Sequence, residues 1–133
     1  MKREILFRGK DFLKEEWVYG DLVKTKNFVA IKRTNGDYFH PTQVSPNTVG
    51  QYTGLKDKDG REIYEGDILQ YIGKRRDNMN KVYRRKVVFH EGMFALLSKE
   101  LPAYSALNYH CMEDGRSAWS VIGNIHDNPE LIK

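Results

Sequence analysis

The stretch from residue 49 to residue 71 constrains the fold most, because four glycines divide it into short pieces. Within residues 56–60, an Asp-Gly pair supplies the positive φ angles that a tight hairpin turn needs. A second turn at 65–67 leads into residues 68–72, a short run of β-branched and aromatic residues that is typical of a strand. We therefore predict β-strands joined by tight, solvated turns in this part of the chain.

The N-terminal part of the chain shows the same pattern of short apolar runs between turn residues. Strand-like runs occupy residues 4–8, 16–23, 27–33 and 38–40. Between the last two runs, Asn35-Gly36 favours a hairpin turn of type I′, which needs positive φ at both positions. We predict that residues 1–47 form a small antiparallel sheet, the N-terminal β subdomain.

The second part, residues 48–133, has further strand-like runs at 86–90, 93–97 and 117–125. A basic loop at 73–86 comes before a strand, a tight turn and another strand, and this order is typical of an SH3-like barrel. Residues 101–116 are the least strand-like segment, with room for one or two helical turns after a proline. We predict a mostly β protein whose second part is an SH3-like β-barrel subdomain, with at most short helical turns.

The predicted core consists of large apolar side chains on strand-like runs beside turn signals. Their removal from water is the main favourable contribution to folding. The residues that we expect to be largely buried are Trp17, Phe28, Ile31, Tyr52, Ile63, Ile68, Val88, Phe94, Trp119 and Ile122.

Net charge and cysteine content indicate which partners and which compartment suit the protein. The 133 residues carry a net charge of +4, which favours anionic partners without deciding for nucleic acid. The single cysteine, Cys111, allows no intrachain disulfide and fits a reducing compartment. The N-terminal residues contain no apolar signal segment, and no apolar run approaches the roughly 18 residues that span a membrane. We therefore expect a cytoplasmic protein with no membrane partner.

The strongest candidate for a binding site is the basic segment, residues 74–86. It contains seven lysine and arginine residues against one aspartate. Cations can follow a nucleic-acid backbone, and a tyrosine ring can stack on a base. The candidate nucleic-acid-binding residues are Lys74, Arg75, Arg76, Lys81, Tyr83, Arg84, Arg85 and Lys86.

Side chains alternate along a strand, so the cations at the end of the basic segment should not all share one face. The alternative to a binding site is a solvated loop that projects from the barrel, stays mobile and keeps the protein soluble.

No catalytic or metal-binding signature is recognisable in the sequence. Asp57 and Asp59 have the spacing of the first two ligands of a calcium loop, but Gly60 comes too early. The other carboxylates fit turn and rim positions, and these residues are Glu62, Glu65, Asp67, Glu91, Glu113 and Asp114. We therefore predict no catalytic residues, no metal and no cofactor.

Two catalytic alternatives stay open. His110 and Cys111 are neighbours that cannot both aim at one point along a strand, but a fold could bring His90 or His126 to Cys111 as a base. The scattered carboxylates could also pair for acid–base or metal-assisted chemistry.

Three segments resemble the YopX family of phage and prophage proteins. They are REILFRG at 3–9, the glycine-divided stretch at 49–71 and VIGNIHDNPEL at 121–131. The resemblance spans essentially the whole chain, although residues 74–85 and 101–116 lie outside the family pattern. It implies a small β-rich protein with an SH3-like barrel portion, encoded by a phage or an integrated element in a bacterial host cell. It implies no established activity and transfers no catalytic residues.

Three hypotheses of function follow. The first is a non-catalytic protein-interaction or assembly module, either with an unidentified protein partner or as a homo-oligomer. The second is a nucleic-acid-binding protein that contacts DNA or RNA through residues 74–86. The third is a small hydrolase or nuclease.

The assembly hypothesis makes a testable prediction, because strands at sheet edges carry unpaired backbone groups that can join another chain. We expect a homo-oligomer in light scattering at micromolar concentration. A particle mass of 15.6 kDa, that of one chain, would exclude it.

Overall fold

The computed structural model describes residues 3–34, 40–98 and 103–132. The chain divides into two compact units, Met1–Gly54 and Leu55–Lys133.

The first unit is a small antiparallel sheet in which the strands follow the order β4-β3-β2-β1-β5. These strands are β1 (Phe7–Lys10), β2 (Trp17–Lys24), β3 (Val29–Arg33), β4 (Thr42–Gln43) and β5 (Gly50–Lys56). Val18, Ile31 and Val44 form its buried core. The predicted N-terminal sheet is therefore confirmed, and the Asn35-Gly36 turn lies outside the described residues.

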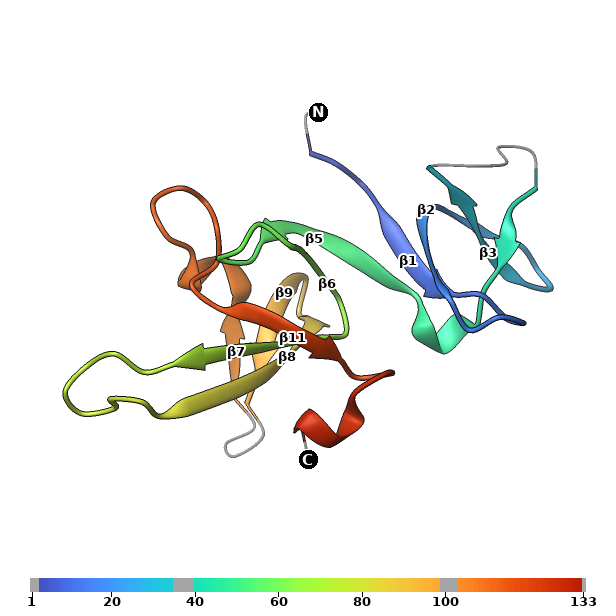
Figure 1. Ribbon diagram of the computed structural model, residues 1–133. Coiled ribbons are helices and arrows are strands. Elements are labelled where there is room, and N and C mark those ends of the chain that lie inside the picture. The colour runs from blue at the N-terminus through green and yellow to red at the C-terminus, as the bar shows by residue number, and fades with distance from the viewer. Residues whose placement is uncertain (1–2, 35–39, 99–102, 133) are drawn as a thin grey trace. The chain divides into compact units, whose positions relative to one another are not determined.

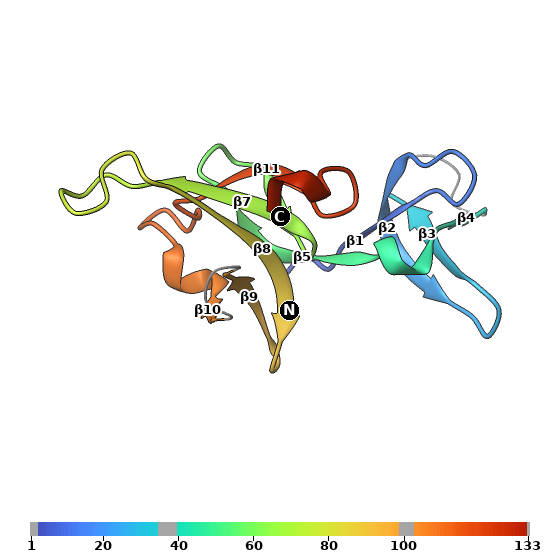
Figure 2. The same cartoon turned by 90° about the horizontal axis from the view of Figure 1, so that it is seen from below.

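The second unit contains a five-stranded antiparallel sheet with the order β10-β9-β8-β7-β11 (Figure 1). Its strands are β7 (Asp67–Ile72), β8 (Val82–His90), β9 (Met93–Leu97), β10 (Tyr104–Ala106) and β11 (Ser120–Asn124). Figure 2 shows β8 as a long, curved strand at the centre of this sheet. A further short strand, β6 (Glu62–Tyr64), is the neighbour of β5 in the sheet order.

The mostly β prediction is confirmed, but the predicted SH3-like barrel is not. Over the part of the chain that the structure describes, β10 and β11 are the two edges of an open sheet. A barrel would require these edges to pair, directly or through other strands.

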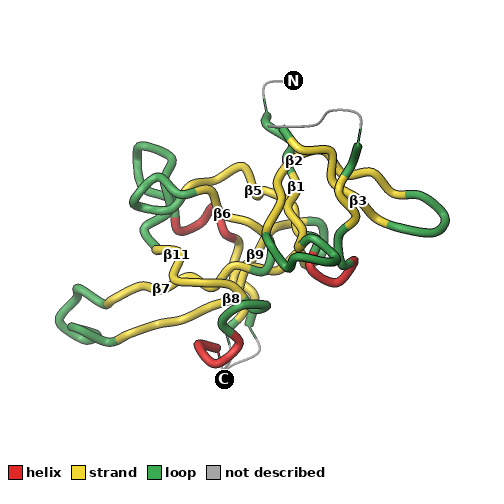
Figure 3. Tube along the Cα trace, turned by 45° about the vertical axis from the view of Figure 1, so that its right-hand side comes forward, coloured by secondary structure: helices red, strands yellow, loops and turns green. Residues whose placement is uncertain are grey.

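Helical structure is limited to single turns, as predicted (Figure 3). In the described ranges the helices are the 3₁₀ segments η1 (Pro46–Thr48), η2 (Leu107–His110) and η3 (Pro129–Ile132). The segment η2 falls within residues 101–116, where helical turns were expected. None of the described helices is long and apolar enough to cross a membrane.

The core of the second unit lies on one face of the five-stranded sheet. Its buried members are Ile63, Leu69, Val87, Leu96, Leu107 and Trp119. Among the predicted core residues, Ile31, Tyr52, Ile63, Ile68 and Trp119 are buried, and Trp17, Val88, Phe94 and Ile122 are half-buried.

The prediction for Phe28 is wrong, because its side chain is 42% exposed. Phe28 precedes β3 and closes a turn in which its backbone N–H and C=O both bond to Thr25. On β8, Val87 faces the core in place of Val88, since neighbouring side chains on a strand point to opposite faces.

The expected solvated turn at 56–60 contains a fully buried carboxylate, that of Asp57. Asp57 Oδ1 accepts hydrogen bonds from the backbone N–H groups of Asp59 and Arg61, both at 2.9 Å. Its other oxygen accepts from the N–H of Val121, also at 2.9 Å. The carboxylate thus joins the turn to β11, and the expectation of a solvated turn fails at this residue.

Asp67 was also assigned to a turn or rim position, and this is wrong. It is only 2% exposed, and its Oδ2 accepts a hydrogen bond of 2.7 Å from the backbone N–H of Tyr64. Both aspartates are buried because they satisfy backbone donors that the tight turns leave unpaired.

The Asp57 contacts predict a large effect on stability. Asp57→Ala leaves three backbone donors without their acceptor, and one unsatisfied buried donor costs about 1–3 kcal/mol. We expect the free energy of unfolding, measured by urea denaturation, to fall by about 3 kcal/mol or more. Asp59→Ala, at an exposed position in the same turn, is the matched control and should change it by less than about 0.5 kcal/mol. Equal stability of the two variants would contradict this role.

Candidate functional site

The predicted basic loop at 73–86 is shorter in the structure. Strand β7 ends at Ile72 and β8 begins at Val82, so the connection covers residues 73–81. Val82 and Tyr83 pair with Ile72 and Tyr71 across the two strands, which extends the sheet into the basic segment. In Figure 1 the connection is the yellow-green loop beyond the ends of β7 and β8.

The loop is closed by its own hydrogen bonds. The backbone N–H of Gly73 donates to Lys81 O at 2.8 Å, and that of Asn80 donates to Gly73 O at 2.9 Å. A side chain at position 73 would place a Cβ only 2.1 Å from Asn78 O, so the closure requires glycine there. Greater mobility of this loop stays a prediction.

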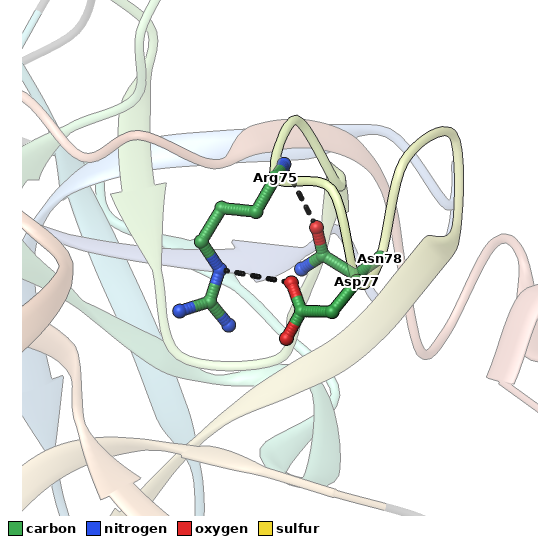
Figure 4. Close-up of polar contacts among 3 residues, drawn as sticks. All are labelled: Arg75, Asp77 and Asn78. Carbon is green, nitrogen blue, oxygen red and sulfur yellow. Dashed lines mark hydrogen bonds and ion pairs between the residues drawn. The ribbon is translucent and has the colours of Figure 1, made fainter.

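Arg75 is held at the tip of the loop by two contacts (Figure 4). Its backbone N–H donates to Asn78 Oδ1 at 2.9 Å, and its Nε lies 3.6 Å from Asp77 Oδ1. Both charged side chains are about three-quarters exposed, so the ion pair contributes little to stability. It does orient the guanidinium.

The basic residues divide between the two faces of β8, as the alternation predicted. Tyr83 and Arg85 share the face of Val87, which belongs to the core. Arg84 lies on the opposite face, where its Nε donates to Gln70 Oε1 at 3.0 Å. The structure therefore does not bring the predicted site residues together as one set.

Lys74, Arg76 and Lys81 are exposed on the loop, whereas Lys86 is half-buried on β8. The Nζ of Lys81 lies 5.0 Å from the centre of the Tyr83 ring.

The Tyr83 face of the sheet opens into a cleft of about 650 Å³. The cleft receives side chains from β7, β8 and β10, from η2 and from the segment that leads into β11. The aromatic and basic side chains of its lining are Tyr71, Arg75, Tyr83, Arg85, Tyr109, His110 and Trp119.

Five aromatic rings form a continuous row along the cleft. The ring centres of Tyr83 and Tyr71 are 6.3 Å apart, and those of Tyr71 and Trp119 are 5.6 Å apart. The row continues to His110 at 5.7 Å from Trp119 and to Tyr109 at 5.4 Å from His110. Trp119, the middle ring, is buried, whereas Tyr83 at one end is half-buried and Tyr109 at the other is 82% exposed. The row thus passes over the core at its centre and reaches solvent at the Tyr109 end.

Arg85 supplies positive charge inside this ring-lined space. Its Cζ lies 5.6 Å from the centre of the Tyr83 ring and 5.9 Å from that of Trp119, within the range of cation–π attraction. Among the described residues, no carboxylate lines the cleft, although Arg75 and Arg85 both do. The cleft is therefore aromatic and cationic.

His110 and Ser105 form a polar pair in the cleft, with 2.8 Å between Nε2 and Oγ. Burial lowers the pKa of His110 below its ordinary value of 6.5, and the nearby charge of Arg85 lowers it further. A nucleophilic Ser–His pair normally needs a third group that orients the imidazole. The causes of the shift at His110 are burial and Arg85, and no carboxylate is among them in the described ranges.

The neighbouring Cys111 is half-buried and forms an isolated β-bridge with Ser117. Burial raises the pKa of its thiol, and the charge of Asp114 adds to the rise. Activated cysteines require the opposite direction, because the thiolate is the nucleophile. In the part of the chain that the structure describes, no group of three or more His, Cys, Asp or Glu side chains could hold a metal ion.

The sequence missed the part of the cleft that comes from residues 103–119. Tyr71 and Tyr83 adjoin the basic segment, but Tyr109 and His110 reach the cleft only through the pairing of β10 with β9 and the turn at η2. Trp119 was predicted as core, and it is both core and cleft floor. The only sequence signal for this region was its aromatic content.

Because Arg85 lies near His110, removing its charge should change the pKa of His110. In Arg85→Gln the pKa of His110, measured by NMR titration, should rise yet stay below 6.5, because burial is the larger cause of the shift. Arg84→Gln on the opposite face should leave it unchanged.

The lowered pKa of His110 also determines how the stability of the protein changes with pH. The unfolded chain binds the proton more readily, so the contribution of neutral His110 to stability is present above about pH 6.5 and is lost as the pH falls toward the folded pKa. A pKa of His110 at or above 6.5 in the native protein would contradict the assignment.

Comparison with known proteins places the chain in a family. The crystal structure of protein EF1440 from Enterococcus faecalis matches with a TM-score of 0.61 and 26% sequence identity, over 98% of this chain and 99% of that one. None of the curated proteins matched the chain. The family model described as YopX protein matches residues 6–133, and the chain belongs to this YopX family.

Proposed function

We propose that this protein is a non-catalytic binding protein that holds single-stranded nucleic acid in the ring-lined cleft. From the sequence alone, a protein-interaction module was the first hypothesis. The observation that favours nucleic acid is the combination of an aromatic row with Arg75 and Arg85 in a cleft whose described lining contains no carboxylate.

The aromatic row matches the requirement for binding unpaired bases. Proteins that bind single strands combine a positively charged groove with aromatic side chains on which successive bases stack. Tyr83 and Tyr109 are the accessible rings at the two ends of the row, and buried Trp119 forms its floor. A duplex hides the faces of its bases, so single strands should bind more tightly.

The arginines provide the electrostatic part of the interaction. Arg85 can contact a phosphate while its guanidinium stays against Tyr83, and Arg75 extends the positive surface along the loop. Phosphate contacts release counterions, so affinity should fall with salt. Sequence preference should be weak, because stacking accepts any base.

A protein partner is the second candidate, and a different surface favours it. Ile72 and Val82 are paired across β7 and β8 on the face opposite Tyr71 and Tyr83. Both are about half exposed, and Met79 in the adjoining loop is exposed as well. Adjacent exposed apolar side chains mark protein contact sites. A homo-oligomer, a cytoplasmic location and a phage or prophage origin stay predictions.

The test of the first proposal is a titration of labelled oligothymidylate at low salt and at physiological salt. Tyr83→Leu, which removes the ring and keeps apolar bulk, should weaken binding by about 1–3 kcal/mol. Arg85→Gln should weaken it about tenfold and reduce the log–log salt slope by about 0.7, the value for one phosphate contact on a single strand.

Arg84→Gln is the matched control, since it removes the same charge from the next residue of β8 on the opposite face. Arg84→Gln should bind oligothymidylate much more tightly than Arg85→Gln does. Equal losses in the two variants, or tighter binding of a duplex than of a single strand, would contradict the cleft as the site. Cleavage of the oligonucleotide during incubation with Mg²⁺ would contradict a non-catalytic role.

A further inference from the structure

A second, smaller hollow adjoins the cleft in the second unit. It has a volume of about 290 Å³, and Tyr71 and Ala118 line both hollows. Its polar lining consists of Lys58, Gln70, Lys74, Asn80 and Ser120. Tyr71 therefore stands between a ring-lined cleft on one side and a lysine-lined hollow on the other.

The hollow lies where β7 extends past β11. The pairing of these two strands reaches Gln70 opposite Ser120, and Tyr71 and Ile72 continue beyond it. An extended ligand that leaves the cleft over Tyr71 can thus enter the hollow without displacing a strand.

Both lysines are mounted on backbone that hydrogen bonds hold in place. Lys58 belongs to the Asp57 turn, and its backbone N–H donates to Trp119 O at 3.1 Å. Lys74 follows Gly73, which closes the loop through its bond to Lys81. Both lysine side chains are exposed, so their ammonium groups are accessible to a ligand.

The chemistry of the hollow differs from that of the cleft. It has two ammonium groups and the neutral polar side chains of Gln70, Asn80 and Ser120, and no carboxylate among the residues described. Lysine binds phosphate as a compact point charge, and amide and hydroxyl groups donate further hydrogen bonds to the phosphate oxygens. Among its described lining residues Tyr71 is the only one with a ring, so the hollow fits a phosphate better than a base.

We propose that this hollow is a phosphate subsite for the same strand whose bases stack in the cleft. The inference rests on the proposed function. It makes the ligand an oligonucleotide that crosses Tyr71, with a base on one side and a backbone phosphate on the other. A mononucleotide occupies the cleft alone and gains nothing from the lysines.

The test compares Lys58→Ala/Lys74→Ala with the native protein on thymidylates of increasing length. The double variant should bind the longer oligothymidylates about tenfold more weakly at low salt. Its log–log salt slope should be lower by about 0.7, which corresponds to the one phosphate contact of the subsite on a single strand. Binding of thymidine 5′-monophosphate, followed by NMR, should be unchanged.

The control is Lys24→Ala/Lys26→Ala, which removes the same charge from exposed positions in the first unit. Equal thermal midpoints of the two double variants show that folding is not the cause of any difference. If the native protein binds oligothymidylate and the two double variants lose affinity equally, the subsite is refuted and the cleft stands. If the native protein binds no oligothymidylate, both proposals are refuted.

Discussion

The buried carboxylate of Asp57 is the interaction on which the second unit most depends. A buried charge is costly unless hydrogen bonds replace its hydration, and Asp57 receives three backbone donors. Two come from its own turn and one from Val121, which lies opposite Leu69 on β7. The neighbouring bonds from Lys58 N–H to Trp119 O and from Ser117 N–H to Lys56 O extend the same junction. One turn thereby fixes how β11 enters the sheet.

The junction also determines the geometry of the candidate site. Trp119, the floor of the cleft, is held through its carbonyl by the residue that follows Asp57. Lys58, in the adjoining hollow, belongs to that same turn. A change at Asp57 should therefore disturb stability and binding together, whereas Tyr83 and Arg85 can be changed at the rim with less effect on the core. Fold and site are coupled through backbone hydrogen bonds, and the ligand-facing side chains lie outside that network.

The sequence predicts local features well and distant ones poorly. Alternation and turn residues correctly indicated antiparallel strands, and a proline in a segment without strand pattern correctly indicated a short helical turn, because these features depend on residues a few positions apart. The burial of Asp57 could not be inferred, since its partner Val121 is 64 residues away. The open sheet and the contribution of Tyr109 to the cleft likewise depend on which strands pair. The prediction that Phe28 is buried was wrong because an apolar residue beside a strand need not lie on the buried face of the sheet.

The two faces of β8 show why net charge is a weak guide to the site. The basic segment looks like a single electrostatic feature in the sequence, yet only Arg75 and Arg85 among its cations line the cleft. Arg84 is directed to the other face, where Gln70 binds it. Charges on both faces attract a polyanion at long range, but only those beside the rings can act while a base is stacked. In the proposed function, selectivity for unpaired strands therefore comes from the aromatic row, and the cations that matter for it are those that share its face.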